Sequence, residues 1–454
     1  MIEAYQESRK KTFRSLFFLY FMIFFCTGIL PVNIDNLLAY LHNTTKFGIG
    51  IISAASLITG IISILIFGYH GDKISEKFSR KKVFIYTNFV WIFTFGLASL
   101  SYNFFYFLFF IVVGAIGTGA FLPLGYSMIG DFYSPKERGK KYGIMQVSLI
   151  LGAGMGIIFG GLLGSYAGPL GWRIAYGLGF VLGLFALISY IFSGIEPERL
   201  RSEPEFENFK GEINYNYKIT YNNLKLLFKT RSIGGILLSV FCSGIANATL
   251  AIWAIFYLTT KINGSDAEFI ATTIYILAGG GALPGSIIGG RLGDKYFKSG
   301  KFKGRVIVSL IGLIVGISLL IIFYILPFYT ETRLQVIFSW IFFLITGYLG
   351  FFLTAFSSGN QFAIYSEVSL PEVRSTANAM NGLMVNLGGI IGNLVISSMI
   401  ENNESLLPFA IFLVLMIWLI GTLFWIIPYL YYPKDLKECR DTLSKRRFDL
   451  EKNI

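Results

Sequence analysis

The tripeptide Gly-Asp-Lys occurs at residues 71–73 and again at 293–295, which is 222 residues further along the chain. Each copy follows an apolar run of about twenty residues, the length of a membrane span, and each opens a segment rich in Lys and Arg. A glycine precedes each aspartate by four residues, Gly68 in the first copy and Gly290 in the second. A hydrophobic chain that repeats such a charged element at half its length is predicted to be a duplicated membrane protein.

The composition supports this interpretation. Of the 454 residues, 54% are hydrophobic and 14% are charged, whereas a soluble domain carries about 25% charged residues. A large soluble helical protein would need amphipathic outer helices, which the sequence does not show. We therefore predict an all-α integral membrane protein with twelve spans, near residues 14–41, 47–69, 83–101, 104–131, 140–166, 172–194, 232–260, 267–290, 306–327, 334–365, 375–400 and 406–430.

The positions of the basic residues predict the orientation of these spans. When alternate loops are placed on one side together with both termini, only Lys46, Arg173, Lys261 and Arg333 fall on the other side, so 34 of the 38 Lys and Arg share one face. By the positive-inside rule that face is cytoplasmic, and we expect a multi-pass protein of the plasma membrane with both termini inside. The net charge of +12 then indicates contact with anionic lipid headgroups and not with nucleic acid.

A second repeat lies in the predicted cytoplasmic loops. Asp131, Pro135 and Arg138 have the same spacing as Glu367, Pro371 and Arg374, at an offset of 236 residues, and the same offset relates Gly152 and Gly156 to Gly388 and Gly392. Two matches at corresponding loops indicate a parallel repeat of six spans. The predicted organisation is a six-helix bundle at 1–194, a cytoplasmic linker at 195–231, a second six-helix bundle at 232–430 and a cytoplasmic tail at 431–454.

The repeated loop resembles the loop motif of the major facilitator superfamily, Gly-x-x-x-Asp-Arg/Lys-x-Gly-Arg-Arg/Lys. The first copy runs from Gly68 through Asp72 and Lys73 to Arg80 after a short insertion, and the second from Gly290 through Asp294 and Lys295 to Arg305. The resemblance covers all twelve spans in topology. It implies the major facilitator fold, two six-helix bundles around a central cavity, and transport by alternating access.

The resemblance also implies a cytoplasmic gate. Asp72 would face the start of the eleventh span near Ser375, and Arg80 would reach Asp131; in the second half Asp294 would face the fifth span near Gly139, and Arg305 would reach Glu367. An aspartate beside a helix N-terminus is favourable. The alternative is that the loops are solvated anchors. The gate residues expected on this basis are Asp72, Lys73, Arg80, Asp131, Arg138, Asp294, Lys295, Arg305, Glu367 and Arg374.

Asp35 is the candidate for proton coupling, because it is the carboxylate that lies well inside an apolar span. Ionisable groups at such depth are costly and usually face a cavity or couple to protons or ions. It follows Gly28, Pro31 and Asn33, which predict a bent helix there. The alternative is a carboxylate hydrated near the outer interface.

Within the superfamily the chain resembles the Spinster-like branch in the loop between spans four and five and in Gly171-Trp172-Arg173. Asp35 stands at the position of that branch's first-helix aspartate, whereas Asn36 replaces the usual arginine, and Val113 and Ala120 replace the branch's fourth-helix Arg and Glu. Glycines of the fifth span also resemble an antiporter motif, with Ile157 in place of its proline. Close helix packing by these glycines is the alternative interpretation.

Polar and aromatic residues inside the spans are candidates for lining a substrate cavity, and the alternative for each is a hydrogen bond between helices. Together they describe a largely uncharged pocket, which favours small amphipathic or neutral solutes; the Spinster-like resemblance adds lysolipids. The candidates are Asn33, Thr118, Tyr126, Gln146, Asn247, Trp253, Tyr257, Asn360, Gln361, Asn381 and Asn386.

No phosphate-binding loop, metal-ligand spacing or Ser/His/Asp set is evident, so we expect neither an enzyme nor a cofactor or metal site. We predict a monomeric secondary transporter of a small molecule or lipid, proton-coupled through Asp35, with export favoured over import. The alternatives are an uncoupled facilitator and a transporter-fold sensor that does not transport.

Overall fold

In the part of the chain that the computed structural model describes, the regular secondary structure is helical, apart from a bridge between His42 and Asn103, and turns and irregular segments join the helices. The described residues are 2–30, 32–44, 46–74, 79–197, 202–204, 229–262, 267–327, 332–402 and 404–452. Among them, nine helices are long and apolar enough to cross a membrane, and a shorter apolar helix covers Ala55–Gly68. The all-α membrane fold predicted from the sequence is confirmed.

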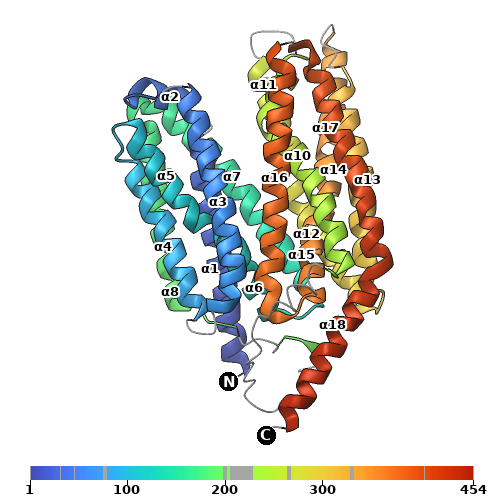
Figure 1. The fold of residues 1–454 in the computed structure, drawn as a ribbon. Helices are drawn as coiled ribbons and strands as arrows, with labels where there is room; N and C mark the ends of the chain where they lie inside the picture. The colour runs from blue at the N-terminus through green and yellow to red at the C-terminus, as the bar shows by residue number, and fades with distance from the viewer. Residues whose placement is uncertain are drawn as a thin grey trace. The chain divides into compact units, whose positions relative to one another are not determined.

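Each of the twelve predicted spans coincides with one helix or with consecutive helices (Figure 1). The first half contains α1 (Ile2–Ile29), α2 (Ile34–Tyr40), α3 (Lys46–Ile74), α4 (Arg80–Ala98), α5 (Phe104–Gly119), α6 (Phe121–Phe132), α7 (Arg138–Tyr166) and α8 (Gly171–Ser193). The second half contains α10 (Arg231–Thr259), α11 (Ala267–Gly279), α12 (Ala282–Lys298), α13 (Gly304–Ile325), α14 (Arg333–Thr354), α15 (Phe356–Val368), α16 (Arg374–Asn402), α17 (Leu407–Thr422) and α18 (Ile426–Lys452).

The first span is broken between α1 and α2, as its glycine, proline and asparagine predict. The side chain of Asn33 donates to the carbonyl of Ile29 at 3.0 Å and to that of Gly160 in α7 at 2.9 Å. The first bond satisfies a carbonyl at the break, and the second joins the break to α7. Side-chain bonds of this kind allow an interrupted helix in a membrane.

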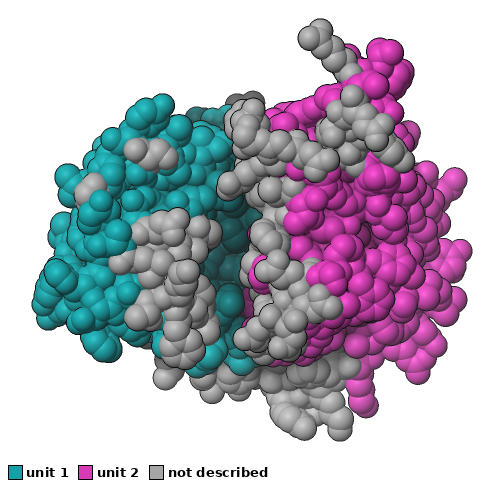
Figure 2. All heavy atoms as spheres, turned by 90° about the horizontal axis from the view of Figure 1, so that it is seen from above, with its two compact units in different colours: residues 1–132, 145–221, 371–379 teal, residues 133–144, 222–370, 380–454 magenta. Residues whose placement is uncertain are grey.

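The chain forms two compact units, coloured separately in Figure 2. Unit 1 comprises Met1–Phe132, Met145–Tyr221 and Pro371–Ala379; unit 2 comprises Tyr133–Ile144, Asn222–Leu370 and Met380–Ile454. Each unit therefore includes a short segment from the other half of the sequence. The two segments are repeat counterparts, because an offset of 236 carries residues 135–143 onto 371–379. The division into bundles at 1–194 and 232–430 stays a prediction.

The repeat is visible in how glycines pack the helices inside each unit. In unit 1, a Cβ atom at Gly152 or Gly156 of α7 would clash with the backbone of α1 at Phe21 or Phe25. In unit 2, a Cβ at Gly388 or Gly392 of α16 would meet the backbone of α10 at Phe241 or Ile245. Such contacts between helix backbones are the packing role expected of small residues in membrane helices.

The glycine contacts predict opposite effects for neighbouring substitutions in α7. Gly156→Ala places a methyl group against the carbonyl of Phe25 and should destabilise the fold by about 1–3 kcal/mol. Gly154→Ala and Gly161→Ala add their methyl groups to open space, and alanine's higher helix propensity should make them neutral or stabilising by up to about 1 kcal/mol. Thermal unfolding of the purified protein in detergent measures all three. Equal melting temperatures for Gly156→Ala and Gly154→Ala would contradict the packing interpretation.

Candidate functional site

A buried ion network in unit 1 surrounds Asp131, which lies at the end of α6. Nη1 of Arg80 lies 2.7 Å from Oδ2 of Asp131, and Nη1 of Arg374 lies 2.6 Å from Oδ1. All three side chains are at most 2% exposed. The structure thus forms the Arg80–Asp131 pair that the sequence resemblance implies, and it adds a second arginine to the same carboxylate.

Two acids of the linker join this Asp131 network. Oε1 of Glu196 accepts a hydrogen bond from the backbone N–H of Arg80 at 2.9 Å, and the same carboxylate lies 3.6 Å from the Arg80 guanidinium. Glu203 is buried and forms an ion pair with Nη2 of Arg374. The added acids compensate the charge of the second arginine, since a buried charge is tolerated only when it is paired.

Unit 2 contains the corresponding Asp294 network. Arg305, at the start of α13, lies between two acids: its Nη1 is 2.8 Å from Asp294 and its Nη2 is 3.0 Å from Glu367. Tyr432 of α18 hydrogen-bonds the other oxygen of Glu367, and Arg305 also donates to the carbonyl of Pro135. The expected contact of Arg305 with Glu367 is present in the structure.

Asp294 also binds the first turn of α7. Its two carboxylate oxygens accept from the backbone N–H groups of Gly139 at 3.1 Å and Lys140 at 2.9 Å. These amides have no partner within their own helix and carry the positive end of its dipole, so a carboxylate is favourable there. Gly290 and Gly139 permit the approach, because a Cβ at either would clash with the backbone of the other.

The related position in unit 1 is the contact of α3 with the first turn of α16. A Cβ at Gly68 would clash with the side chain of Ala379, and the hydroxyl of Thr376 donates to the carbonyl of Gly68 at 3.0 Å. The side chains of Asp72 and Lys73 lie outside what the structure describes. The predicted contact of Asp72 with the helix start near Ser375 therefore stays a prediction.

The other expected gate residues differ in their placement. Arg138 is fully buried and donates from Nε to the carbonyl of Tyr133 at 3.0 Å. Lys295 is exposed at the end of α12 and has no ion pair among the described residues. The exposed lysine fits the solvated alternative considered for the basic runs.

Several cavity candidates are placed in hydrogen bonds between helices of one unit. Gln146 of α7 donates to the hydroxyl of buried Tyr126 at 2.8 Å. The amide of Asn360 donates to the carbonyl of Gly289 at 3.0 Å, and Asn381 accepts from the hydroxyl of Tyr365 at 3.2 Å. Asn33 is likewise bound to Gly160. These contacts agree with the alternative interpretation, hydrogen bonds between helices, at least as well as with a role in lining a cavity.

The remaining cavity candidates differ in burial and in their hydrogen bonds. Thr118 and Asn247 bond to carbonyls of their own helices at 3.4 and 2.8 Å. Tyr257 is buried and donates to the carbonyl of Tyr324 at 2.9 Å, beside Lys261, whose pKa is lowered to about 8 by burial. Trp253, Gln361 and Asn386 are half-buried. The side chain of the proton-coupling candidate, Asp35, lies outside what the structure describes; its backbone lies in the first turn of α2.

Comparison with known proteins decides the family. The family model described as the Major Facilitator Superfamily matches residues 16–393. The chain belongs to the major facilitator superfamily. This transporter is 20% identical over 416 residues to Multidrug resistance protein 3 of Bacillus subtilis (strain 168), covering 80% of this chain and 74% of the relative.

A second relative and a solved structure extend the comparison. The transporter is 23% identical over 445 residues to Protein spinster homolog 1 of Xenopus tropicalis, covering 88% of this chain and 80% of the relative. It has a TM-score of 0.68 to the proton:xylose symporter XylE at 16% identity, over 92% of this chain and 95% of that one. The major facilitator fold and the resemblance to Spinster proteins, both expected from the sequence, are confirmed.

Sequence reasoning missed three members of the networks: Glu196, Glu203 and Tyr432. A possible signal was that two acids of the linker lie on a face otherwise rich in Lys and Arg. The arginines that they approach are distant in sequence, at positions 80 and 374, so spacing alone could not connect them. Nothing in the sequence pattern around Tyr432 distinguishes it from the other aromatic residues.

The Asp131 network predicts a large cost for removing its central charge. Asp131→Asn preserves the shape of the side chain but leaves Arg80 and Arg374 without their shared carboxylate, and breaking a buried pair in this way costs about 3–5 kcal/mol. Glu438→Gln is the control, since the Glu438–Lys434 pair spans 3.9 Å with both side chains exposed and should contribute less than about 1 kcal/mol. Thermal unfolding in detergent compares the two variants. A loss for Asp131→Asn no larger than that of the control would show that the network is not the buried ion cluster described.

Proposed function

We propose that this transporter moves a small amphipathic or neutral organic solute, or a lysolipid, by proton-coupled alternating access. It is a multi-pass membrane protein of the major facilitator superfamily; substrate class, coupling and direction are the proposed part. We place it in the plasma membrane with both termini in the cytoplasm, in accordance with the basic residues of its loops and tails. Export is the favoured direction.

The observation that carries the substrate class is the distribution of buried charge. Among the side chains that the structure describes, the buried charged ones belong to the Asp131 and Asp294 networks or lie next to them in sequence: Arg80, Asp131, Arg138, Glu203, Asp294, Arg305, Glu367, Glu372 and Arg374. The fully buried interior that the structure describes away from the networks is apolar or neutral, and half-buried cations such as Lys261 and Arg173 lie at helix ends. A binding site built from apolar or neutral residues has no fixed cation to neutralise a multiply charged substrate and favours an apolar or amphipathic one.

The similarity to a multidrug resistance protein supports export of an organic compound, and the similarity to a spinster protein supports the Spinster-like resemblance from which the lysolipid is proposed. These relatives share at most 23% identity over the compared lengths. They therefore support a class of cargo and not a particular compound.

The two networks are proposed to act as gate contacts. Each joins a helix start to acids and arginines that are far away in sequence. Because desolvation offsets much of the attraction in a buried ion pair, a network that becomes hydrated when it opens can exchange two states at moderate cost. This is the property required of an alternating-access gate.

Asp35 is proposed to carry the coupled proton. The break between α1 and α2 places it at the start of a short helix next to Asn33 and Asn36, whose amide groups contact the carbonyls of Gly160 and Gly164. A carboxylate at an interrupted helix can exchange a proton with water entering from one side. The usual arginine partner of the Spinster-like branch is replaced by Asn36, so the aspartate would titrate without it.

Asp35→Asn tests the coupling. In proteoliposomes with a pH gradient of one unit, one proton exchanged per solute permits up to about tenfold accumulation, because one unit corresponds to about 1.4 kcal/mol. We expect accumulation of NBD-labelled lysophosphatidylcholine, or of a compound from a neutral amphipathic library, in the wild type. The variant should reach only the equilibrium level, and Glu438→Gln should behave as wild type. Full accumulation by Asp35→Asn would remove Asp35 as the proton site, and gradient-independent equilibration by the wild type would indicate a facilitator.

Asp294→Asn tests the gate. The variant weakens the ion pair with Arg305 and the bond to the first turn of α7. The form of the transporter in which the gate contacts around Asp294 are open should therefore become more populated. A cysteine introduced at Ser286, which is fully buried against Gly143, reports the opening through its rate of maleimide labelling. We expect labelling to accelerate several-fold in the Asp294→Asn background and not in the Lys295→Gln background. Equal rates in all backgrounds would contradict a gating role for Asp294.

A further inference from the structure

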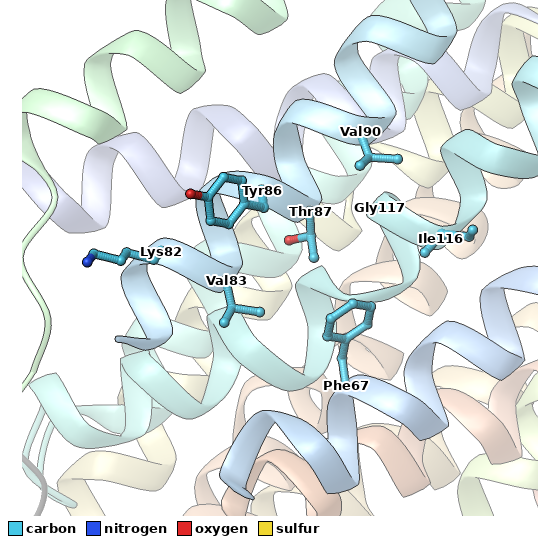
Figure 3. A pocket seen from close by; sticks show the side chains of 8 residues that line it. All are labelled: Phe67, Lys82, Val83, Tyr86, Thr87, Val90, Ile116 and Gly117. Carbon is cyan, nitrogen blue, oxygen red and sulfur yellow. The ribbon is translucent and has the colours of Figure 1, made fainter. Parts of the chain in front are cut away.

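A groove on the surface of unit 1 runs along α4 between α3 and α5. Its volume is about 390 Å³, and Figure 3 shows the side chains that line it. Phe67 comes from α3, and Ile116 and Gly117 come from α5. The remaining lining residues belong to α4: Lys82, Val83, Tyr86, Thr87 and Val90.

The groove opens on an exposed, largely apolar face. Tyr86 is 70% exposed and Ile116 is 41% exposed, and large apolar side chains nearby on the same helices, such as Phe89 and Phe109, are also exposed. In a protein that crosses the membrane, exposed apolar surface of this kind faces the acyl chains of the bilayer. The occupant expected on physical grounds is therefore a hydrocarbon chain.

The two ends of the groove differ in charge. Lys82 lies in the first turn of α4, and Figure 3 shows its ammonium group directed away from Phe67 and Ile116. Lys82 is exposed and has no ion pair among the described residues, whereas the ammonium of its neighbour Lys81 donates to the carbonyl of Ile191 at 3.0 Å. An available cation at the mouth of an apolar groove matches a phosphate attached to an acyl chain.

The length of the groove matches this ligand. From Lys82 to Val90 the helix rises eight residues, or about 12 Å at about 1.5 Å per residue. One leaflet contributes about half of the roughly 30 Å hydrocarbon core, so the groove spans most of one leaflet, starting at its headgroup side. Lys82 belongs to the loop segment whose basic residues predict the cytoplasmic side, and anionic lipids are concentrated in that leaflet.

We propose that this groove is a binding site for an anionic diacyl phospholipid of the cytoplasmic leaflet, with one acyl chain between α3, α4 and α5 and the phosphate at Lys82. The ligand is a resident lipid and not the transported substrate. The site adds a specific position to the general attraction of the basic face for anionic headgroups, and it does not depend on the proposed cargo or coupling.

The test is lipid binding to the purified protein, measured by native mass spectrometry during titration with phosphatidylglycerol or phosphatidylcholine. Lys82→Gln should weaken binding of the first phosphatidylglycerol about fivefold, corresponding to about 1 kcal/mol for one lysine near an anionic surface. It should weaken phosphatidylcholine less, because the choline group offsets the charge of the phosphate. Val83→Trp fills the groove and should abolish tight binding of either lipid. The controls are Lys298→Gln, an exposed lysine of α12, and Leu97→Trp, an exposed position of α4 outside the groove; both should bind as wild type.

Two outcomes would overturn the proposal. The first is unchanged phosphatidylglycerol binding in both Lys82→Gln and Val83→Trp. The second is an equal loss in Lys298→Gln, which would indicate general attraction to a basic surface. Ile116→Trp repeats the groove-filling test from α5 if Val83→Trp does not fold, as judged by elution and melting temperature.

Discussion

The structure depends on pairing the charged groups that it buries at helix ends. A carboxylate or guanidinium removed from water costs several kcal/mol, and the described interior meets that cost in two clusters around Asp131 and Asp294. Glycines make the clusters possible, because Gly290 and Gly139 bring a helix start close enough for Asp294 to bind its free amides. The glycine that precedes the charged loop motif therefore allows the close approach that its aspartate needs to bind the helix start.

The two clusters use the same kind of buried ion pairing with different numbers of acids and arginines. Asp131 and Glu367 are related by the offset of 236, yet Asp131 binds two arginines, whereas Glu367 shares one arginine with Asp294 and binds Tyr432. The additional arginine in unit 1 is compensated by Glu203, which belongs to the linker and has no repeat counterpart. The two ion clusters of this duplicated chain are therefore not equivalent. The linker contributes an acid, Glu203, to the cluster around Asp131.

Much of this arrangement could be predicted from the sequence, because spans and repeats are periodic and local. Offsets of 222 and 236 residues indicated the parallel repeat, and the same offset of 236 relates the segments exchanged between the compact units. The roles of Glu196 and Glu203 could not be predicted, since a contact between a linker acid and a distant arginine has no period. The role of the cavity candidates could not be predicted either. The sequence does not distinguish a polar residue that faces a cavity from one that bonds to a neighbouring helix, as Asn33 and Asn360 do.

The distribution of charge also explains why the family is easier to establish than the cargo. The networks consist of paired charges at fixed spacing in the sequence. Both partners of such a pair must be present, because an unpaired buried charge is costly. Recognition of a neutral or amphipathic solute relies instead on shape and on a few hydrogen bonds, which many sequences can supply. Both kinds of constraint apply at Asp35 and Asn36, because Asp35 is a charged group whose sequence neighbour is a neutral amide. With an asparagine in place of the branch's arginine, protonation of Asp35 would depend on hydration at the break between α1 and α2 more than on a fixed countercharge.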